Sequence, residues 1–264
     1  MAKAIKGENK REQRQKKIQS ILLDRGMARI QEMCELLGCS EATLRNDLRE
    51  MESKGLIKRT FGGAISTGNL VGSNFVHQKL HQPEKEAIAR YVVQNVIREG
   101  STVVLDVGTT TMAVAQELAR SNRKVNVVTN SLITANFLIK NENIDIHVPG
   151  GKYDRFLDTF DFSDSIAYYN NIHADYFLMS CNGVTLEAGF TVPQKALAVS
   201  KSIIMKHVDQ SVMLADHTKI GKTAFYKACD FSDIDLLVVD DKCGENDKQL
   251  LKSTGVDVRY AAEL

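Results

Sequence analysis

Hydrophobic residues in the first quarter of the chain recur every three or four positions, which is the spacing of one helix face. The pattern predicts a first helix over residues 11–24 and a second over residues 30–37. Gly38 follows the second helix and can adopt the left-handed conformation that a sharp turn requires. Ser40 suits the N-cap of a third helix, because its hydroxyl can accept a bond from an unpaired amide of the first turn. Residues 28–47 are therefore interpreted as a helix-turn-helix.

The third helix separates apolar from polar side chains. Leu44, Leu48 and Met51 lie four and then three positions apart, so they are predicted to face the core. The remaining positions carry polar and basic side chains that suit base edges and phosphates. The predicted DNA-binding residues of this region are Ser40, Thr43, Arg45, Asn46 and Arg49.

A second DNA-binding feature follows the third helix. Residues 55–65 contain β-forming residues around Gly62 and Gly63, which predicts a hairpin of the kind called a wing. Lys58 and Arg59 on this wing would follow the DNA backbone and make the affinity salt-dependent. The alternative is a small three-helix module that binds protein rather than DNA.

Charge is distributed unevenly along a chain whose net charge is only +1. Residues 1–67 carry 14 Lys and Arg against 9 Asp and Glu, whereas the rest of the chain carries 20 against 24. A positive excess around the helix-turn-helix agrees with a polyanionic partner such as double-stranded operator DNA. With 264 residues, 43% of them hydrophobic, the chain is long enough for two separate cores.

The pattern changes after residue 66. Residues 67–83 lack sustained periodicity and end in a proline, which predicts a linker between a winged helix-turn-helix domain over residues 1–66 and a second domain over residues 84–264. In the second domain, helical patterns alternate with short β-branched runs, which predicts an α/β fold with a Rossmann-like, mostly parallel sheet covered on both faces. The predicted strands are residues 102–106, 125–129, 144–148, 175–180, 211–216 and 235–240.

Several of these strands end in polar loops, where open α/β sheets bind ligands. In the first loop, amides, hydroxyls and a helix dipole can point at an anion such as phosphate, and Asp106 can accept bonds from sugar hydroxyls. Lys85, Arg155 and Lys219 could balance the anion, although each taken singly is more often a solvated surface residue. The predicted effector-binding residues are Lys85, Asp106, Gly108, Thr109, Thr110, Thr111, Asn130, Ser131, Gly150, Gly151, Arg155, Asn182, Gly183 and Lys219.

These motifs resemble those of DeoR-type bacterial transcriptional regulators. The resemblance rests on Arg14, on three segments of the first domain and on five of the second, namely residues 40–48, 55–59 and 62–63, then 84–89, 105–111, 128–132, 149–151 and 215–221. It implies an effector domain similar to ribose-5-phosphate isomerase and glucosamine-6-phosphate deaminase folds. It also implies a phosphorylated sugar or related metabolite as ligand, and a structural role for Asp47.

The sequence departs from the family pattern at three places. Asn46 stands where many members carry a second basic residue, residues 180–183 contain a cysteine and an asparagine, and the segment after Arg155 is more aromatic and acidic than is common. These departures leave the base preference and the identity of the effector open.

The leading hypothesis is a regulator, usually a repressor in this family, of a carbohydrate-metabolism operon, with operator affinity controlled by a phosphorylated sugar. Because one module reads few base pairs, we expect a homo-oligomer, a dimer or tetramer, with half-sites about 34–36 Å apart or a multiple of that. The alternative is a sugar-phosphate isomerase or deaminase with an appended DNA module, in which Asp106, Asp216 and Lys219 would supply acid–base chemistry.

Other residues add little chemistry. The five cysteines lack CxxC pairing and the six histidines are dispersed, so we assign no metal, no cofactor and no catalytic residue, and we expect reduced thiols. No stretch approaches the roughly 18–20 apolar residues of a membrane span, and the N-terminus is polar. The sequence therefore predicts a soluble cytoplasmic protein that is not an enzyme and has no membrane partner.

Overall fold

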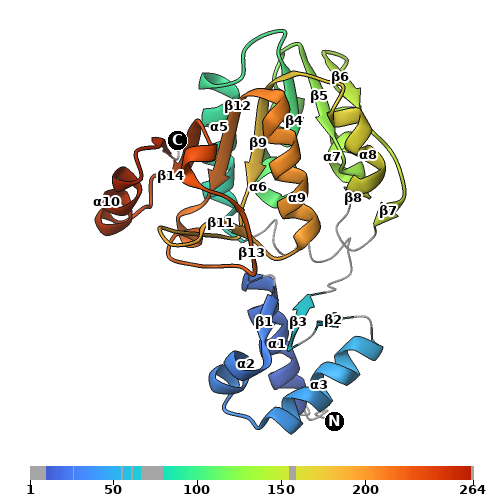
Figure 1. Cartoon of the computed structure of the whole chain (residues 1–264), viewed down its shortest axis with the longest axis vertical. Helices are drawn as coiled ribbons and strands as arrows, with labels where there is room; N and C mark the ends of the chain where they lie inside the picture. The colour runs from blue at the N-terminus through green and yellow to red at the C-terminus, as the bar shows by residue number, and fades with distance from the viewer. Residues whose placement is uncertain are drawn as a thin grey trace, which may run out of the picture. The chain divides into compact units, whose positions relative to one another are not determined.

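The computed structural model describes residues 10–25, 27–54, 56–60, 62–66, 80–154 and 159–262. The chain forms two compact units, residues 1–77 and residues 78–264 (Figure 1). In the described part of the chain, no helix combines the length and the apolar character needed to cross a membrane.

The first unit contains three helices and a small antiparallel sheet. The helices are α1 (Lys10–Arg25), α2 (Ile30–Leu37) and α3 (Glu41–Ser53). The sheet has the order β1-β3-β2 and consists of β1 (Met27–Arg29), β2 (Ile57–Thr60) and β3 (Gly63–Ser66). The predicted apolar stripes meet in one core, which includes Ile18, Leu22, Met33, Leu44, Leu48 and Met51.

Two local features set the geometry of the turn and the wing. Gly38 has a φ of 60°, the left-handed conformation expected there, and the Ser40 hydroxyl accepts a bond from Thr43 N at 3.3 Å. Gly63 lies so close to Ala28 O that a Cβ would collide with it. The hairpin of β2 and β3 confirms the predicted wing, whereas the strand β1 was not predicted.

The second unit is built on a seven-stranded sheet with the order β15-β14-β12-β9-β4-β5-β6, and all its neighbouring strands are parallel. The six predicted strands are all present, and β15 adds a seventh. The strands are β4 (Thr102–Leu105), β5 (Val125–Thr129), β6 (Ile144–His147), β9 (Ala174–Ser180), β12 (Val208–Ala215), β14 (Leu236–Asp240) and β15 (Asp257–Ala261).

Helices cover both faces of this sheet, as predicted (Figure 1). The core on one face contains Val103 and Leu105 with residues of α5 (Gln82–Asn95), α6 (Thr109–Arg120) and α7 (Leu132–Leu138). The core on the other face contains Val104 with residues of α8 (Phe162–Tyr169), α9 (Lys195–Ile204) and α10 (Glu245–Ser253). Because side chains alternate along a strand, neighbouring valines of β4 supply both cores.

Two further small sheets lie beside the main one and were not predicted. A hairpin of β7 (Tyr153–Asp154) and β8 (Thr159–Phe160) follows β6. A three-stranded antiparallel sheet contains β10 (Gly183–Thr185), β11 (Gly189–Val192) and β13 (Tyr226–Cys229). Asn182 and Gly183 were predicted only as a polar strand end, but Gly183 is the first residue of β10 and Asn182 directly precedes it.

Candidate functional site

The recognition helix α3 presents a polar exposed face. Arg45 donates from Nε and Nη2 to Glu41 Oε1, at 2.8 and 2.5 Å. Arg49 Nη1 donates to Asn46 Oδ1 at 2.8 Å. The two arginines of α3 that were predicted to contact DNA are thus each held by a neighbouring side chain of the same helix.

Asp47 points the opposite way, into the unit. Its side chain is buried, and it accepts bonds from Arg14 Nε at 2.5 Å and from Arg11 Nε at 3.2 Å. The hydrogen bond that Arg14 donates to Asp47 raises the pKa of Arg14. Asp47 therefore fixes α3 against α1, which agrees with its expected structural role.

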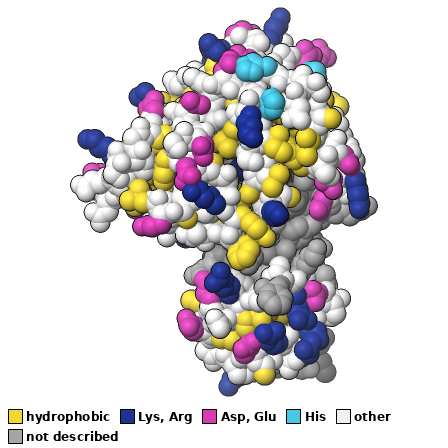
Figure 2. Space-filling model, in the orientation of Figure 1, with side chains coloured by type: hydrophobic (Ala, Val, Ile, Leu, Met, Phe, Trp, Pro, Cys, Tyr) yellow, Lys and Arg dark blue, Asp and Glu magenta, His cyan; other side chains and the backbone are white. Residues whose placement is uncertain are grey.

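The wing is attached to the end of the recognition helix. The backbone N–H of Arg59 donates to Glu52 Oε1 at 2.8 Å, and the Arg59 guanidinium lies 3.8 Å from the same carboxylate. The backbone of Lys58 is paired with Ile65 in the hairpin. Figure 2 shows several Lys and Arg side chains along one side of this unit.

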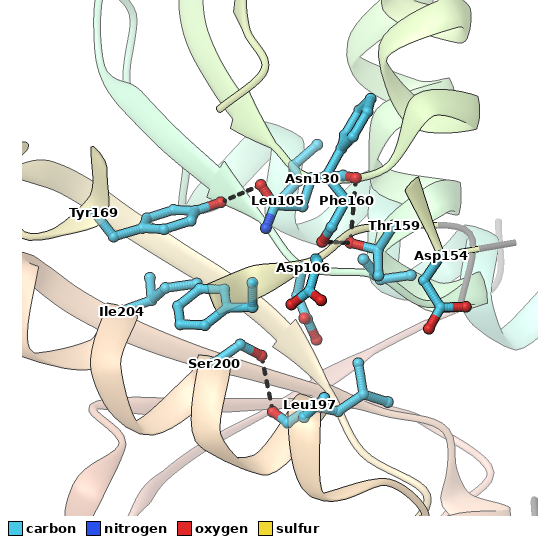
Figure 3. A pocket seen from close by; sticks show the side chains of 14 residues that line it. Leu105, Asp106, Asn130, Asp154, Thr159, Phe160, Tyr169, Leu197, Ser200 and Ile204 are labelled. Atoms are coloured by element: carbon cyan, nitrogen blue, oxygen red, sulfur yellow. Dashed lines mark hydrogen bonds between the residues drawn. The ribbon is translucent and has the colours of Figure 1, made fainter. Parts of the chain in front are cut away.

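A cavity of about 130 Å³ opens at the carboxyl ends of β4 and β5 (Figure 3). The hairpin β7–β8 and helices α8 and α9 complete its wall, so it combines aromatic rings with polar groups. Its lining includes Asp106, Asn130, Asp154, Thr159, Phe160, Asp161, Phe162, Tyr169, Leu197 and Ser200. Asp106 and Asn130, both predicted to bind the effector, are thereby brought together.

Each of these two side chains has a buried partner. Lys201 Nζ lies 2.7 Å from Asp106 Oδ2, and both side chains are almost fully buried, with exposures of 1% and 5%. Tyr169 donates to Asn130 Oδ1 at 3.0 Å. Asp106 and Asn130 are thus held in fixed orientations beside the cavity, which a binding site requires.

The loop that contains Gly108, Thr109, Thr110 and Thr111 leads into helix α6 next to Asp106. Thr111 Oγ1 donates to Asp106 O at 2.8 Å and to Gly108 O at 3.0 Å. A Cβ on Gly108 would collide with Ser180 Oγ, so any other residue here would force the Ser180 hydroxyl to move. Thr110 is buried and Thr109 is half-buried at the start of the helix.

Several other predicted residues have evident structural contacts. Ser131 caps α7 by accepting a bond from Thr134 N, and Gly150 and Gly151 adopt φ values of 77° and 117°. A Cβ on Gly183 would collide with Lys222 O. Arg155 lies outside the described residues. None of the predicted residues Lys85, Gly108, Thr109, Thr110, Thr111, Ser131, Gly150, Gly151, Asn182, Gly183 and Lys219 is among the described residues that line the cavity.

Lys85 and Lys219 belong to a second polar cluster, at the end of β12. Asp216 is fully buried, and its Oδ2 lies 3.8 Å from Lys219 Nζ. Lys85 is 5% exposed and donates to Leu80 O at 2.6 Å. Burial lowers the pKa of Lys85 to about 8, although the attraction of Asp216 opposes this shift. Burial also disfavours ionisation of Asp216, but Lys219 and a hydrogen bond from Thr218 outweigh it and lower the pKa of Asp216.

Sequence reasoning missed Lys201 and Tyr169. One signal was available for Lys201, because it lies four residues after Leu197 and three before Ile204, on the face of α9 that is otherwise apolar. A lysine on such a face needs a buried partner, but nothing in the local pattern identifies Asp106 as that partner.

Comparisons with known proteins agree with this architecture. A DeoR-like helix-turn-helix domain matches residues 14–69, and the DeoR C terminal sensor domain matches residues 80–241. The HTH-type transcriptional regulator GolR of Listeria innocua is 32% identical over 94% of this chain and 98% of its own length. The HTH-type transcriptional repressor GlcR of Bacillus subtilis is 32% identical over 86% of this chain and 88% of its own.

A partial likeness of fold is found among solved structures. A ribose 5-phosphate isomerase A from Methanocaldococcus jannaschii has a TM-score of 0.39 and 14% identity, over 53% of this chain and 55% of that one. A likeness of this size bears on neither ligand nor reaction. One matched domain lies in each unit, and GolR and GlcR match over 98% and 88% of their own length. The chain therefore belongs to the DeoR family and is a DNA-binding transcriptional regulator.

Proposed function

We propose that this regulator is a repressor of a carbohydrate-metabolism operon and that a phosphorylated sugar controls its affinity for the operator. The cavity at the ends of β4 and β5 is the observation that carries the proposal. It offers carboxylate, amide and hydroxyl groups for sugar hydroxyls, and aromatic rings for the apolar face of a sugar. The relative GlcR is described as a transcriptional repressor, which supports a repressor role for this chain.

The phosphate of the effector would lie beside the cavity rather than within it. The described cavity lining contains aspartates but no lysine or arginine. The loop from Gly108 to Thr111 begins the helix α6, whose N-terminal amides and dipole favour an anion. Lys219, which follows β12, and Lys85, which lies on α5, are candidate counter-charges, and Arg155 stays a prediction of the sequence.

The regulator would act by binding and not by turnover. Of the three groups that an isomerase-like alternative would use, only Asp106 lines the cavity in the described residues, and Lys201 neutralises it. Asp216 and Lys219 are paired with each other at another strand end. The Asp106 carboxylate is already engaged by Lys201, which supports a sensor rather than a catalytic base.

The domain assignment follows the predicted boundaries. We assign DNA binding to residues 1–66, a linker to residues 67–83 and effector binding to residues 84–264, in a cytoplasmic homo-oligomer. An effector can weaken operator binding only as far as it prefers the arrangement that does not bind DNA. The proposed DNA contacts are Ser40, Thr43, Arg45, Asn46, Arg49, Lys58 and Arg59.

A gel-shift titration tests the proposal. Purified protein is titrated on the DNA upstream of its own gene, with and without a panel of phosphorylated sugars and their unphosphorylated forms. One phosphorylated compound should shift the binding curve, and the unphosphorylated form should not. Thr109→Ala and Lys219→Ala should abolish the response without changing DNA binding, whereas Lys252→Ala, at an exposed position of α10, should preserve it. Turnover of any of these compounds would overturn the assignment as a sensor.

A further inference from the structure

We propose that Glu41 determines operator specificity by holding the guanidinium of Arg45 in the orientation that reads a guanine of a G·C base pair. This inference rests on the DNA-binding function of the recognition helix. Glu41 was absent from the predicted DNA contacts.

Glu41 lies at the end of α3 that is expected to meet DNA. It is the first residue of α3, directly after the N-cap Ser40. In helix-turn-helix proteins, the N-terminal residues of the recognition helix contact base edges in the major groove. Arg45 lies one turn further along the same face, and the side chains of Glu41 and Arg45 are 53% and 45% exposed. Both are therefore accessible to DNA.

Two hydrogen bonds to Glu41 fix the orientation of the Arg45 guanidinium. Glu41 Oε1 accepts from Nε and from Nη2 of Arg45, so the carboxylate occupies one edge of the planar guanidinium. The Nη1 and Nη2 end of the fork still carries hydrogens that point away from Glu41. Two parallel donors of this kind match O6 and N7 of guanine. The pair thus presents a preoriented guanine reader rather than a mobile cation.

The charge of Glu41 has an opposite effect on non-specific binding. A carboxylate at the DNA-facing end of the helix repels phosphates, so it lowers the affinity for every sequence. An arginine without a partner can turn toward any nearby phosphate, whereas an arginine held by Glu41 is limited to acceptors that lie in front of its remaining donors. Glu41 therefore lowers the affinity for random DNA and raises discrimination between sequences.

A purely structural role predicts a different result. An acidic residue in the first turn stabilises a helix through the dipole, and an exposed pair four residues apart adds a small further stabilisation. Both effects would change the melting temperature and would leave the preferred DNA sequence unchanged. Base preference is therefore the readout that separates the two roles.

The test selects binding sites from a random duplex DNA library with the full-length protein. It compares the wild type with Glu41→Ala, Glu41→Gln and Arg45→Ala, and uses Glu35→Gln on α2 as the matched control. Affinities for the wild-type motif and for a scrambled duplex are then measured by fluorescence anisotropy. Circular dichroism melting checks that each variant is folded.

Glu41→Ala should lose the preference for one G·C pair, at the same position of the motif as Arg45→Ala. The ratio of specific to scrambled affinity should fall about tenfold, which corresponds to the loss of one oriented base contact. Affinity for the scrambled duplex should rise about twofold, because a negative charge is removed. Glu41→Gln keeps an acceptor oxygen and should retain part of the preference, and Glu35→Gln should match the wild type.

Two outcomes would overturn the inference. If Glu41→Ala enriches the wild-type motif unchanged, Glu41 has no role in specificity, and the DNA-binding function stands. If the preference is lost at a position other than the one lost in Arg45→Ala, Glu41 does not act through Arg45. A wild-type protein that enriches no motif would instead remove the sequence-specific function on which the inference rests.

Discussion

Arg14 Nε lies 2.5 Å from Asp47 Oδ2, and this ion pair joins the first helix to the recognition helix. Asp47 is adjacent in sequence to Asn46, which faces solvent, but its own side chain is buried. The pair therefore sets how the recognition helix sits on its scaffold, without contributing to the DNA-facing surface.

The first prediction concerns this pair. Asp47→Asn keeps the size of the side chain but removes the charge that Arg14 and Arg11 share. Hydrogen bonds to charged groups contribute about 1.5–3 kcal/mol, so the helix-turn-helix unit should lose stability of that order. Calorimetry should show a lower melting temperature for this unit. The affinity of the variant for operator DNA and for random DNA should fall by the same factor. Glu35→Gln, at an exposed position, provides the control, and a selective loss on operator DNA would contradict the prediction.

The second prediction concerns the buried pair beside the cavity. Lys201→Met leaves the Asp106 carboxylate buried without its cation, which typically costs about 3–5 kcal/mol. The double variant Asp106→Asn with Lys201→Met removes both charges and should recover much of this loss. A double-mutant cycle by denaturant unfolding measures the coupling. Additive effects of the two single changes would show that the two side chains act independently.

The third prediction concerns the dependence of stability on pH. Lys85 has a pKa of about 8 in the folded protein and about 10.5 when unfolded. Below pH 8 it is protonated in both states; between pH 8 and 10.5 the unfolded chain binds more protons, so the free energy of unfolding rises with pH. The rise should approach about 3 kcal/mol and should be missing in Lys85→Met. Calorimetric scans across this range measure it, and equal slopes for both proteins would refute the assignment.

The fourth prediction concerns the wing. Arg59→Ala should weaken binding to operator and random DNA by the same factor, because a backbone contact carries no sequence information. The slope of log affinity against log salt should become less steep by about 0.9 if one phosphate contact is lost. Arg45→Ala is the contrasting variant, with a loss about 1–3 kcal/mol larger on operator than on random DNA. A selective loss on operator DNA in Arg59→Ala would contradict the backbone contact, and an equal loss on both DNAs in Arg45→Ala would contradict the base contact.

The fifth prediction concerns the thiols. Burial raises the pKa of Cys181, Cys229 and Cys243 to about 12, so they are hardly ionised at neutral pH. Cys34 and Cys39 are only partly buried. A thiol reagent at pH 8 should therefore react quickly with at most two groups in the folded protein and with all five after denaturation. Rapid reaction of more than two thiols in the folded state would contradict the burial of these three.

Periodic elements were predicted well, because their signal is local. The second helix was predicted at residues 30–37 and is found at Ile30–Leu37, and the central strands agree within a few residues. The strands β10, β11 and β13 were missed, although the predicted strands β4 and β6 are equally short. Their sequences lack an apolar run such as TVVL in β4, and they pair only after the chain has folded back.

The candidate site was predicted only where it follows a strand. Asp106 and Asn130 end β4 and β5, and the rule for open sheets was enough to place them at one edge. Their partners Lys201 and Tyr169 come from helices, and their contacts depend on how α8 and α9 cross the sheet. Polar strand ends can indicate where a ligand site begins, but the wall that encloses the site belongs to the tertiary fold.

The strand order of the main sheet also affects how the protein is made. Strand β4 lies between β5, which follows it closely in the sequence, and β9, which begins only at Ala174. On a ribosome, β4, β5 and β6 emerge while the inner edge of β4 still lacks its neighbour, and such an edge invites aggregation. The helix-turn-helix unit, whose contacts are local, can already be complete at that stage. In a newly made chain, the helix-turn-helix unit can thus fold before the seven-stranded sheet is complete.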